Sequence, residues 1–368
     1  MEKNKIRVGV IGASLNSWGG LAHLPALQAL SNFEVTAIST TRRESADETA
    51  ERFNIPHAFT DSYELIQHPD VDLVIIAVKV PEHEKLAMAA LEAGKHVFSE
   101  FPLGRTTEEA KNLLQMAEEK GLRHFVGLQA RTNPSIQYVK DLLADGYIGK
   151  VLAVHVNYSM PSPLGESNQI SQSHRHILDE TGGMNMLTVT AGHMLDGIMY
   201  MLGPVSEVSG ILETQSEQFQ IIETGENVRA TAPDHVVVNG KLANGAILSA
   251  HFRYAILGNI SIEFNGTEGD LILQPKDNLM FQMDSFQIKG NQRGGQLEEL
   301  PVPSQYNKLP LSIQAGLSYN VAGLYTQIGD DLTLNTNNAP DFRTALSVHS
   351  LLDLVRQAAA TGTRQIGI

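Results

Sequence analysis

The feature that most constrains the fold is a regular alternation of short apolar runs and helix-like segments in the first third of the chain. Amphipathic stretches, such as 44–53 and 107–120, separate the apolar runs. The predicted strands of this half are Ile6 to Ile11, Glu34 to Ser39, Leu73 to Val78, His96 to Ser99 and His124 to Val126. This alternation is typical of a parallel sheet whose strands are joined by crossover helices.

After Gln129 the pattern changes to alternating polar and apolar residues, which predicts a mostly antiparallel sheet with one face open to solvent or a partner. The predicted strands here are Val151 to Tyr158, His235 to Leu242, Ala246 to Arg253, Ile260 to Phe264 and Leu271 to Leu273. We expect helices at 134–145, 184–201 and 341–360, the last packing back on the body, and a loop at 290–296. The fold class is therefore α/β, with one domain at 1–128 and a second at 129–368.

Composition and net charge limit the kinds of molecule that this protein is expected to bind. The chain has 368 residues, a formal net charge of −14 and no cysteine, so disulfides, thiolate nucleophiles and Cys-ligated metals are excluded. The negative charge opposes binding to nucleic acid and to anionic lipid. No apolar run is long enough to span a membrane and no signal peptide is recognisable, so we expect a cytoplasmic protein that binds a small molecule or another protein.

A glycine-rich stretch follows the first predicted strand directly. Gly12, Ser14, Trp18 and Gly19 lie in it, at a wider spacing than the usual dinucleotide fingerprint. Glycines at this place permit a tight turn and a close approach of backbone amides to a pyrophosphate. The alternative is a glycine-rich surface turn, in which Trp18 anchors the loop by packing rather than covering a cofactor.

The end of the second predicted strand indicates which nucleotide is bound. NAD-binding proteins usually carry Asp or Glu there, whereas this chain has Thr40, Thr41, Arg42 and Arg43. Guanidinium groups bind a 2′-phosphate well, so the sequence favours NADP over NAD. The alternative is that both arginines begin a helix in solvent.

Three segments carry a family resemblance: Leu91 to Val97, Gly182-Gly183 with Gly192 to Asp196, and the turn Gly266 to Gly269. Together with the first strand they resemble the Gfo/Idh/MocA family of NAD(P)-dependent sugar and polyol dehydrogenases. This resemblance implies a Rossmann dinucleotide-binding domain followed by an α/β domain with a large open sheet, often used for dimerisation. The long first loop ending in His23 and Pro25 resembles a regulatory branch of that family, the NADP-binding galactose-pathway repressors of yeasts.

The chain departs from the family at the proton-handling positions. Family dehydrogenases usually read Glu-Lys-Pro where this chain has Glu100-Phe101-Pro102, and Phe101 has no group that donates or accepts a proton. An aspartate expected before the motif histidine is also missing. His193 remains as the candidate catalytic acid/base, with Asp196 one helical turn later. The alternative for His193 is a satisfied core histidine.

Further candidate contacts follow from strand ends and from the resemblance. Candidate cofactor contacts besides the loop and the arginine segment are Val78, Pro81, His83, Glu100, Phe101 and Gln129. Candidate substrate contacts are Arg131, Tyr158, His174, Arg175, Asp179 and Asp196. Packing, capping or solvent exposure explains several of them equally well, and no metal site is expected because no third ligand has a defined spacing.

Three functions fit these residues. The first is an NAD(P)-dependent oxidoreductase acting on a sugar or sugar derivative, working without the usual lysine. The second is a non-catalytic NADP-binding regulator or sensor with a protein partner. The third is a glycosidase-like enzyme that uses bound NAD for transient oxidation. In each case we expect a homodimer or homotetramer, because the second-domain sheet is predicted to have an uncovered face.

Overall fold

The computed structural model describes residues 5–161, 168–276, 280–310, 313 and 316–367. The chain forms two compact units, one made of Met1–Thr132 with Lys308–Leu346 and the other of Asn133–Asn307 with Ser347–Ile368. The chain crosses between the units after Thr132, four residues beyond the predicted boundary. A segment late in the sequence also returns to the first unit, which the sequence pattern does not indicate.

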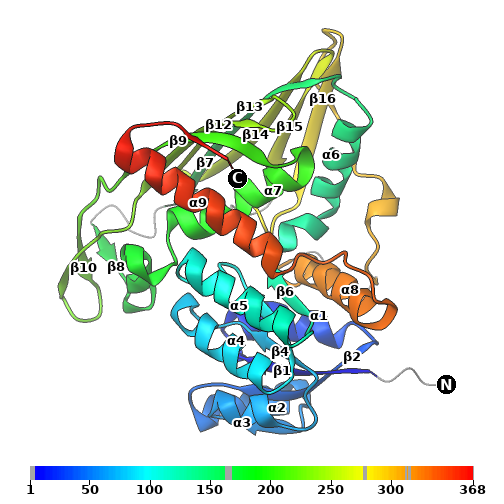
Figure 1. Ribbon diagram of the computed structural model, residues 1–368, viewed down its shortest axis with the longest axis vertical. Coiled ribbons are helices and arrows are strands. Elements are labelled where there is room, and N and C mark those ends of the chain that lie inside the picture. The colour runs from blue at the N-terminus through cyan, green and yellow to red at the C-terminus, as the bar shows by residue number, and fades with distance from the viewer. Residues whose placement is uncertain (1–4, 162–167, 277–279, 311–312, 314–315, 368) are drawn as a thin grey trace. The chain divides into compact units, whose positions relative to one another are not determined.

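The first unit is built on a six-stranded parallel sheet with the strand order β3-β2-β1-β4-β5-β6 (Figure 1). Its strands are β1 (Ile6–Ile11), β2 (Phe33–Ser39), β3 (His57–Phe59), β4 (Leu73–Ile76), β5 (His96–Glu100) and β6 (His124–Gly127). This order is that of the Rossmann fold, in which the strand order reverses beside β1 while all strands stay parallel. The predicted parallel sheet is thereby confirmed.

Helices connect these strands. They are α1 (Leu24–Gln28), α2 (Arg43–Phe53), α3 (Ser62–Gln67), α4 (His83–Glu92) and α5 (Thr107–Glu119). The late helix α8 (Tyr319–Leu334) belongs to the same unit but connects none of its strands. Helix α5 begins with a hydroxyl cap, because the Thr106 side chain accepts a hydrogen bond from the Glu109 amide at 3.1 Å. Helix α8 contacts α1, and its Tyr325 is fully buried beside Phe98 and Phe33 in the core of this unit.

The second unit contains a nine-stranded sheet with the order β17-β16-β15-β14-β7-β13-β12-β9-β18, in which only the pair β13–β7 is parallel among the described strands. Its strands are β7 (Val151–Pro161), β9 (Val205–Glu213), β12 (His235–Leu242), β13 (Ile247–Ala255), β14 (Asn259–Gly266), β15 (Gly269–Pro275), β16 (Phe286–Gln292), β17 (Glu298–Glu299) and β18 (Gln365–Ile366). A smaller sheet joins β8 (Gln169–Ile170), β10 (Gln218–Ile221) and β11 (Asn227–Arg229).

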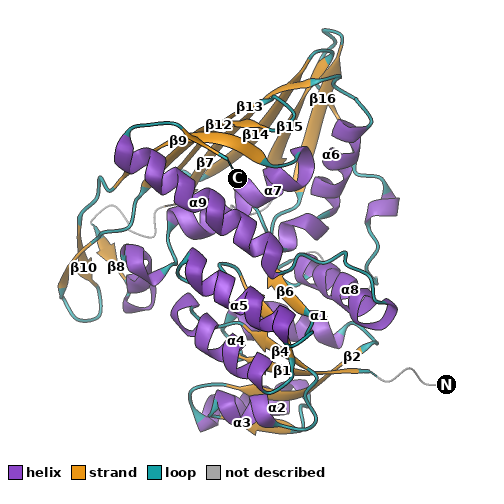
Figure 2. Cartoon of the chain, in the orientation of Figure 1, coloured by secondary structure: helices purple, strands orange, loops and turns teal. Residues whose placement is uncertain are grey.

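One face of the nine-stranded sheet is covered by helices (Figure 2). Helices α6 (Pro134–Ala144) and α7 (Gly192–Leu202) pack on each other, and α9 (Phe342–Thr361) places Val355 against Gly210 of β9. Side chains on the other face, such as Ile211, His155 and Ile247, are exposed. The prediction of a mostly antiparallel sheet with an uncovered face is thereby confirmed.

Two glycine-containing segments of this unit meet in a close backbone contact. A Cβ on Gly266 would lie 2.0 Å from the Ile148 carbonyl oxygen, and one on Gly149 would lie 2.4 Å from the Thr267 hydroxyl. Gly149 also has a φ of 71°, which other residues adopt rarely. The glycines of this family-like turn therefore serve backbone packing.

Several predicted boundaries are wrong. The segment 184–201 is not one helix, because a π-helical turn (Met186–Ala191), capped by the Asn185 side chain, precedes α7. Strand β16 extends into the predicted loop at 290–296. Strands β3, β9 and β16 and helix α8 were not predicted. No helix within the described ranges is both long and apolar enough to cross a membrane.

Candidate functional site

The glycine-rich loop after β1 is fixed by its own backbone and by Ser17. The Ser17 hydroxyl donates to the carbonyl oxygens of Gly12 and Ser14, at 2.6 and 2.7 Å. Gly12 has a φ of 86°, and a Cβ there would lie 2.4 Å from the Ala77 carbonyl oxygen. A Cβ on Gly19 would lie 2.4 Å from the carbonyl oxygen of Gly12. The loop is therefore a preformed tight turn at the carboxyl end of β1, where dinucleotides bind in this fold.

Trp18 is half-buried in this loop. Its ring meets the His23 ring edge-on, with centroids 6.0 Å apart, and it packs against the apolar core of the first unit. This placement favours the anchoring role over cofactor covering. A π-helical turn (Gly19–His23) then leads into α1 and buries His23 completely.

The two arginines after β2 differ in whether other residues bind their guanidinium groups. Arg43 donates to the Asp47 carboxylate at 3.2 Å and to the Ala58 carbonyl oxygen at 2.8 Å. The exposed Arg42 guanidinium has no hydrogen bond or ion pair within the described part of the chain. Thr40 is buried, and its hydroxyl donates to the Arg42 carbonyl oxygen at 2.9 Å. Arg42 is thus the side chain available to a ligand here.

The ring of His83 contacts the segments that follow strands β4 and β5. Its Nδ1 lies 2.8 Å from the Pro102 carbonyl oxygen and its Nε2 lies 3.0 Å from the Val78 carbonyl oxygen. A neutral ring has one N–H, so it donates to one of these carbonyls at a time. Burial lowers the pKa of His83 below its usual 6.5, and the nearby Glu100 acts in the opposite direction. His83 therefore links the end of β4 to the segment after Phe101, and it does not act as a helix cap.

Two buried acceptors at the ends of β5 and β6 lack a good donor. Gln129 Oε1 accepts no hydrogen bond from the described residues. Glu100 Oε1 lies 2.9 Å from His23 Nε2, but the geometry is not that of a hydrogen bond. A Cβ on Gly127 would lie 2.6 Å from Glu100 Oε2, so Gly127 makes room for this carboxylate. Phe101, between Glu100 and Pro102, is buried and supplies no polar atom.

These features fit a bound dinucleotide. Buried polar atoms normally have partners, so orphaned acceptors at this edge are suited to hydroxyl or amide donors of a ligand. The loop, Arg42 and the two acceptors all belong to the first unit and follow β1, β2, β5 and β6. The same edge of the sheet therefore carries each element that a dinucleotide needs.

Arg131 has a different setting. It lines a cavity of about 390 Å³ beside β6, together with Arg123, Arg343 and Asp331 of the same unit. Arg343 pairs with Glu118 at 2.6 Å, and Arg123 donates to the Thr336 carbonyl oxygen at 2.5 Å. This cavity is lined by charged groups that already have partners, and the substrate role of Arg131 stays a prediction.

The remaining candidates belong to the second unit. His193 and Asp196 are buried on α7, one helical turn apart. Tyr158 is buried, and its hydroxyl accepts a hydrogen bond from the Phe281 amide at 3.2 Å, which favours the packing alternative. The catalytic role of His193 stays a prediction.

The polar segment before α7 is exposed and internally paired. Arg175 makes a two-pronged ion pair with Glu226, at 2.7 and 2.9 Å. His174 Nδ1 lies 2.8 Å from the Ser171 hydroxyl, and Asp179 caps the Thr181 amide at 2.9 Å. The segment 172–178 is a 3₁₀ helix, so the side chains of His174 and His176 do not share one face as they would in an extended strand.

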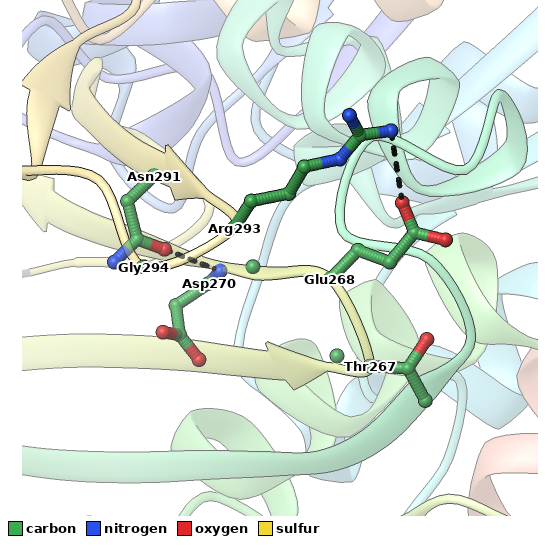
Figure 3. A pocket seen from close by; sticks show the side chains of 8 residues that line it. Thr267, Glu268, Asp270, Asn291, Arg293 and Gly294 are labelled. Carbon is green, nitrogen blue, oxygen red and sulfur yellow. Dashed lines mark hydrogen bonds and ion pairs between the residues drawn. The ribbon is translucent and has the colours of Figure 1, made fainter.

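A surface hollow of about 540 Å³ lies at the turn between β14 and β15 (Figure 3). Two of its three charged side chains, Arg293 and Glu268, are exposed and pair with each other at 3.9 Å, and the third is Asp270. The Asp270 amide donates to the Asn291 side chain at 2.8 Å. The hollow thus offers mainly solvated or paired groups.

One cluster of possible metal ligands lies outside the predicted site. His57, His68 and Asp70 place ligand atoms within 4.8 Å of one another, in the part of the chain that the structure describes. Arg7 donates to the Asp70 carboxylate at 3.0 Å, and His68 Nδ1 accepts the Asp70 amide at 3.3 Å. Two of the three ligands are therefore engaged by protein donors.

The sequence prediction missed the role of His23 and Tyr325. The Tyr325 hydroxyl lies 2.5 Å from His23 Nδ1, on the side of the ring opposite Glu100. The apolar periodicity of Val321, Leu324, Tyr325 and Ile328 is the signal that could have revealed helix α8. No local signal pairs that helix with the first loop.

Comparison with known proteins agrees with this geometry. The sequence model of an oxidoreductase family with an NAD-binding Rossmann fold, GFO_IDH_MocA, matches residues 6–128, and that of the Gal80p C-terminal domain matches residues 134–275. The dehydrogenase aclE of Aspergillus oryzae is 30 % identical over 249 residues, which are 65 % of this chain and 67 % of that protein. The chain belongs to the Gfo/Idh/MocA oxidoreductase family.

Both enzymes and regulators are among its relatives. The galactose/lactose metabolism regulatory protein GAL80 of Saccharomyces cerevisiae is 27 % identical over 73 % of this chain and 66 % of its own length. Levoglucosan dehydrogenase of Pseudarthrobacter phenanthrenivorans is 28 % identical over 73 % of each chain. The chain thus spans about two thirds of the length of the first two relatives named here.

Solved structures show the same fold. A super-repressor mutant of Gal80p from Saccharomyces cerevisiae has a TM-score of 0.85 at 23 % identity, covering 98 % of each chain. A levoglucosan dehydrogenase complexed with NADH and L-sorbose has a TM-score of 0.84 at 23 % identity, also covering 98 % of each chain. The Rossmann unit followed by a unit with a large, mostly antiparallel sheet is therefore the family fold.

Three histidines whose pKa values are lowered by burial should make the first unit less stable at acid pH. Burial lowers the pKa of His83, His96 and His124 below 6.5, so the unfolded chain binds more protons than the folded one as the pH falls through 6.5. The free energy of unfolding then decreases, by up to about 1 kcal/mol per pH unit for each histidine. Urea denaturation between about pH 7.5 and 5.5 should show a smaller pH slope for His83→Gln than for the wild-type protein. A pH slope that is unchanged in His83→Gln would contradict the conclusion that burial lowers the pKa of His83.

Proposed function

We propose that this protein is an NADP-dependent oxidoreductase acting on a sugar or sugar derivative. The observation that carries the proposal is the preformed loop after β1 together with the free guanidinium of Arg42 at the end of β2. Membership of the family and similarity to a levoglucosan dehydrogenase support the substrate class.

The residues of the first unit would hold the nucleotide. Backbone amides of the loop after Gly12 approach the pyrophosphate, and Arg42 binds a 2′-phosphate through its guanidinium fork. Gln129 Oε1 and Glu100 accept hydrogen bonds from the nicotinamide half. The nucleotide supplies a hydride acceptor when it is bound.

His193 is the proposed acid/base. It accepts the proton of the sugar hydroxyl as the carbon-bound hydrogen departs as hydride, so the alcohol becomes a carbonyl. Its imidazole suits this task near neutral pH, and Phe101 leaves no ammonium group at the usual position to share it. Asp196, on the same helix, is the proposed substrate-side partner.

A second candidate function is a regulator that binds NADP without turnover. The observation that favours it is the match of residues 134–275 to the Gal80p C-terminal domain, together with Phe101 in place of the family lysine. In that case a protein partner reads the nucleotide-bound state. A glycosidase-like enzyme that oxidises its substrate transiently also dispenses with the lysine, and would release a hydrolysed sugar with no net reduction of nucleotide.

The nucleotide preference is tested through the two arginines. Arg42→Ala should weaken NADP binding by about 10-fold or more, because it removes a charge-assisted hydrogen bond, and should leave NAD binding unchanged. Arg43→Ala should have a smaller effect, since its guanidinium already binds Asp47 and Ala58. Calorimetric titration measures both affinities, with Arg52→Ala on the same helix as the control. NADP affinity that is unchanged in Arg42→Ala would show that this arginine does not read the phosphate.

Turnover separates the enzyme from the regulator. Nicotinamide absorbance is followed with NADP or NAD and a panel of sugars, and His193→Ala should lower kcat by about 100-fold or more. The half-buried His57→Ala, in the first unit, is the control. Tight nucleotide binding with no reduction on any sugar would support the regulator, and free sugar released without net reduction would support the glycosidase-like enzyme.

We also propose that the chain forms a homodimer or homotetramer through the open face of the nine-stranded sheet. Ile247 and Ile211 are 51 % and 55 % exposed on that face, a degree of exposure that association would remove. Ile247→Lys should shift the mass measured by light scattering toward the monomer, whereas Ile222→Lys, in the turn after β10, should not. A wild-type protein that is monomeric at micromolar concentration contradicts this proposal.

A further inference from the structure

The segment that follows β4 lies between the glycine-rich loop and the segment that follows β5. Strand β4 pairs with β1 on one side and with β5 on the other. A Cβ on Gly12 would lie 2.4 Å from the Ala77 carbonyl oxygen and 2.7 Å from a methyl carbon of Val78, so the loop contacts this segment directly. Residues 77–79 therefore occupy the middle of the carboxyl edge of the parallel sheet.

The ring of His83 holds this segment close to the one that follows β5. Its Nε2 lies 3.0 Å from the Val78 carbonyl oxygen, and its Nδ1 lies 2.8 Å from the Pro102 carbonyl oxygen. Lys79 directly follows Val78 in the chain, and Phe101 directly precedes Pro102. Lys79 and Phe101 therefore stand at adjacent strand ends that one imidazole connects.

Lys79 brings a positive charge to this edge of the sheet. Its side chain is exposed and makes no hydrogen bond or ion pair with the described residues. The segments after β5 and β6 carry two arginines, but Glu109 binds Arg105 at 2.8 Å, and Arg131 lines the cavity beside β6. The glycine-rich loop and the turn after it, residues 12–22, contain no charged residue. Within the part of the chain that the structure describes, Lys79 is thus the cation that a ligand between the loop and β5 can recruit.

The strand order indicates which part of a dinucleotide meets this charge. Strands β1 and β4 flank the point where the strand order reverses, and a dinucleotide binds across that point with its pyrophosphate next to the glycine-rich turn. The formal net charge of −14 opposes the binding of such an anion, and the backbone amides of the loop supply only partial charges. Arg42 follows β2, on the other side of β1 from β4. The anionic group next to Lys79 is therefore the pyrophosphate.

We propose that the ammonium group of Lys79 binds the pyrophosphate of the nucleotide. Lysine binds phosphate as a point charge on a flexible four-carbon stem, so the contact needs no fixed side-chain geometry before the ligand arrives. Pyrophosphate is common to NAD and NADP, so Lys79 raises the affinity for both, whereas Arg42 acts on NADP alone. The inference rests on the proposed nucleotide binding but not on turnover, so it holds for an enzyme and for a regulator.

Calorimetric titration with NADP and with NAD tests this contact. Lys79→Met keeps most of the stem and removes the charge, so the affinities for both nucleotides should fall by the same factor, about 10-fold, through loss of one charge-assisted contact. Lys79→Arg keeps the charge and should bind both nucleotides nearly as wild-type protein does. Lys85→Met is the matched control, because Lys85 is an exposed lysine of α4 whose ammonium group already pairs with Glu82.

Fragments of the nucleotide separate the two phosphate contacts. ADP carries the pyrophosphate, and adenosine 2′-monophosphate carries only the 2′-phosphate. Lys79→Met should weaken the binding of ADP and leave that of adenosine 2′-monophosphate unchanged, whereas Arg42→Ala should do the reverse. In NADP binding the effects of the two substitutions should add, because each removes a contact to a different phosphate.

The outcomes are separable. Wild-type affinities in Lys79→Met, a loss confined to NADP, or a lower kcat with both affinities unchanged would each overturn the inference and leave the proposed nucleotide binding intact. An equal loss in Lys85→Met would overturn it too, because the effect would then belong to net charge and not to position 79. Binding of neither nucleotide by wild-type protein overturns the proposed function, and the inference with it. If Lys79→Met does not fold by circular dichroism, Lys79→Gln takes its place.

Discussion

Parallel hydrogen bonding of β1 to both β2 and β4 is the constraint on which the first unit depends. Because all six strands run in the same direction, the segments that follow them emerge at one edge of the sheet. Gly12, Arg42, Glu100 and Gln129 follow four different strands and are far apart in the sequence. Their common edge, where the proposed nucleotide site lies, is a consequence of that pairing.

The charge balance at the end of β5 is the second organising feature. A lysine at position 101 would place an ammonium group next to Glu100, whereas Phe101 places an apolar ring there. The Glu100 carboxylate instead faces the ring of His23, which is itself contacted by Tyr325 of helix α8. Phe101 therefore supplies neither a charge nor a proton-handling group next to Glu100.

Local patterns predicted much of this fold. Strands β1, β2, β5 and β12 and helices α2, α5, α6 and α9 lie within a residue or two of their predicted bounds, because their apolar spacing and flanking residues are local signals. The long helix predicted at 184–201 failed because a π-helical turn interrupts it, and apolar composition alone does not reveal such an interruption. The very short strand β3 carries too few residues for its alternation to be recognised.

The sequence named a candidate site from the glycine loop and from the side chains at strand ends, and its ligand roles stay predictions. Which of two adjacent arginines is free could not be read from the sequence, because it depends on whether Asp47 and the Ala58 carbonyl reach Arg43. Tyr158 and Arg175 are similar cases, since an amide from Phe281 and the carboxylate of Glu226 occupy them. Side-chain partners of this kind are set by packing between segments that are distant in the sequence.

By itself, the sequence determined the alternation that gives the parallel sheet, the glycine loop, the absence of cysteine and the substitution of Phe101 for the family lysine. Only the tertiary structure decided that His23 and Tyr325, 302 residues apart, meet next to Glu100. The physical reason is that burial of helix α8 against the first unit depends on the summed apolar surface of many distant residues. Once that surface is buried, the Tyr325 hydroxyl and the His23 ring are brought within 2.5 Å of each other inside it.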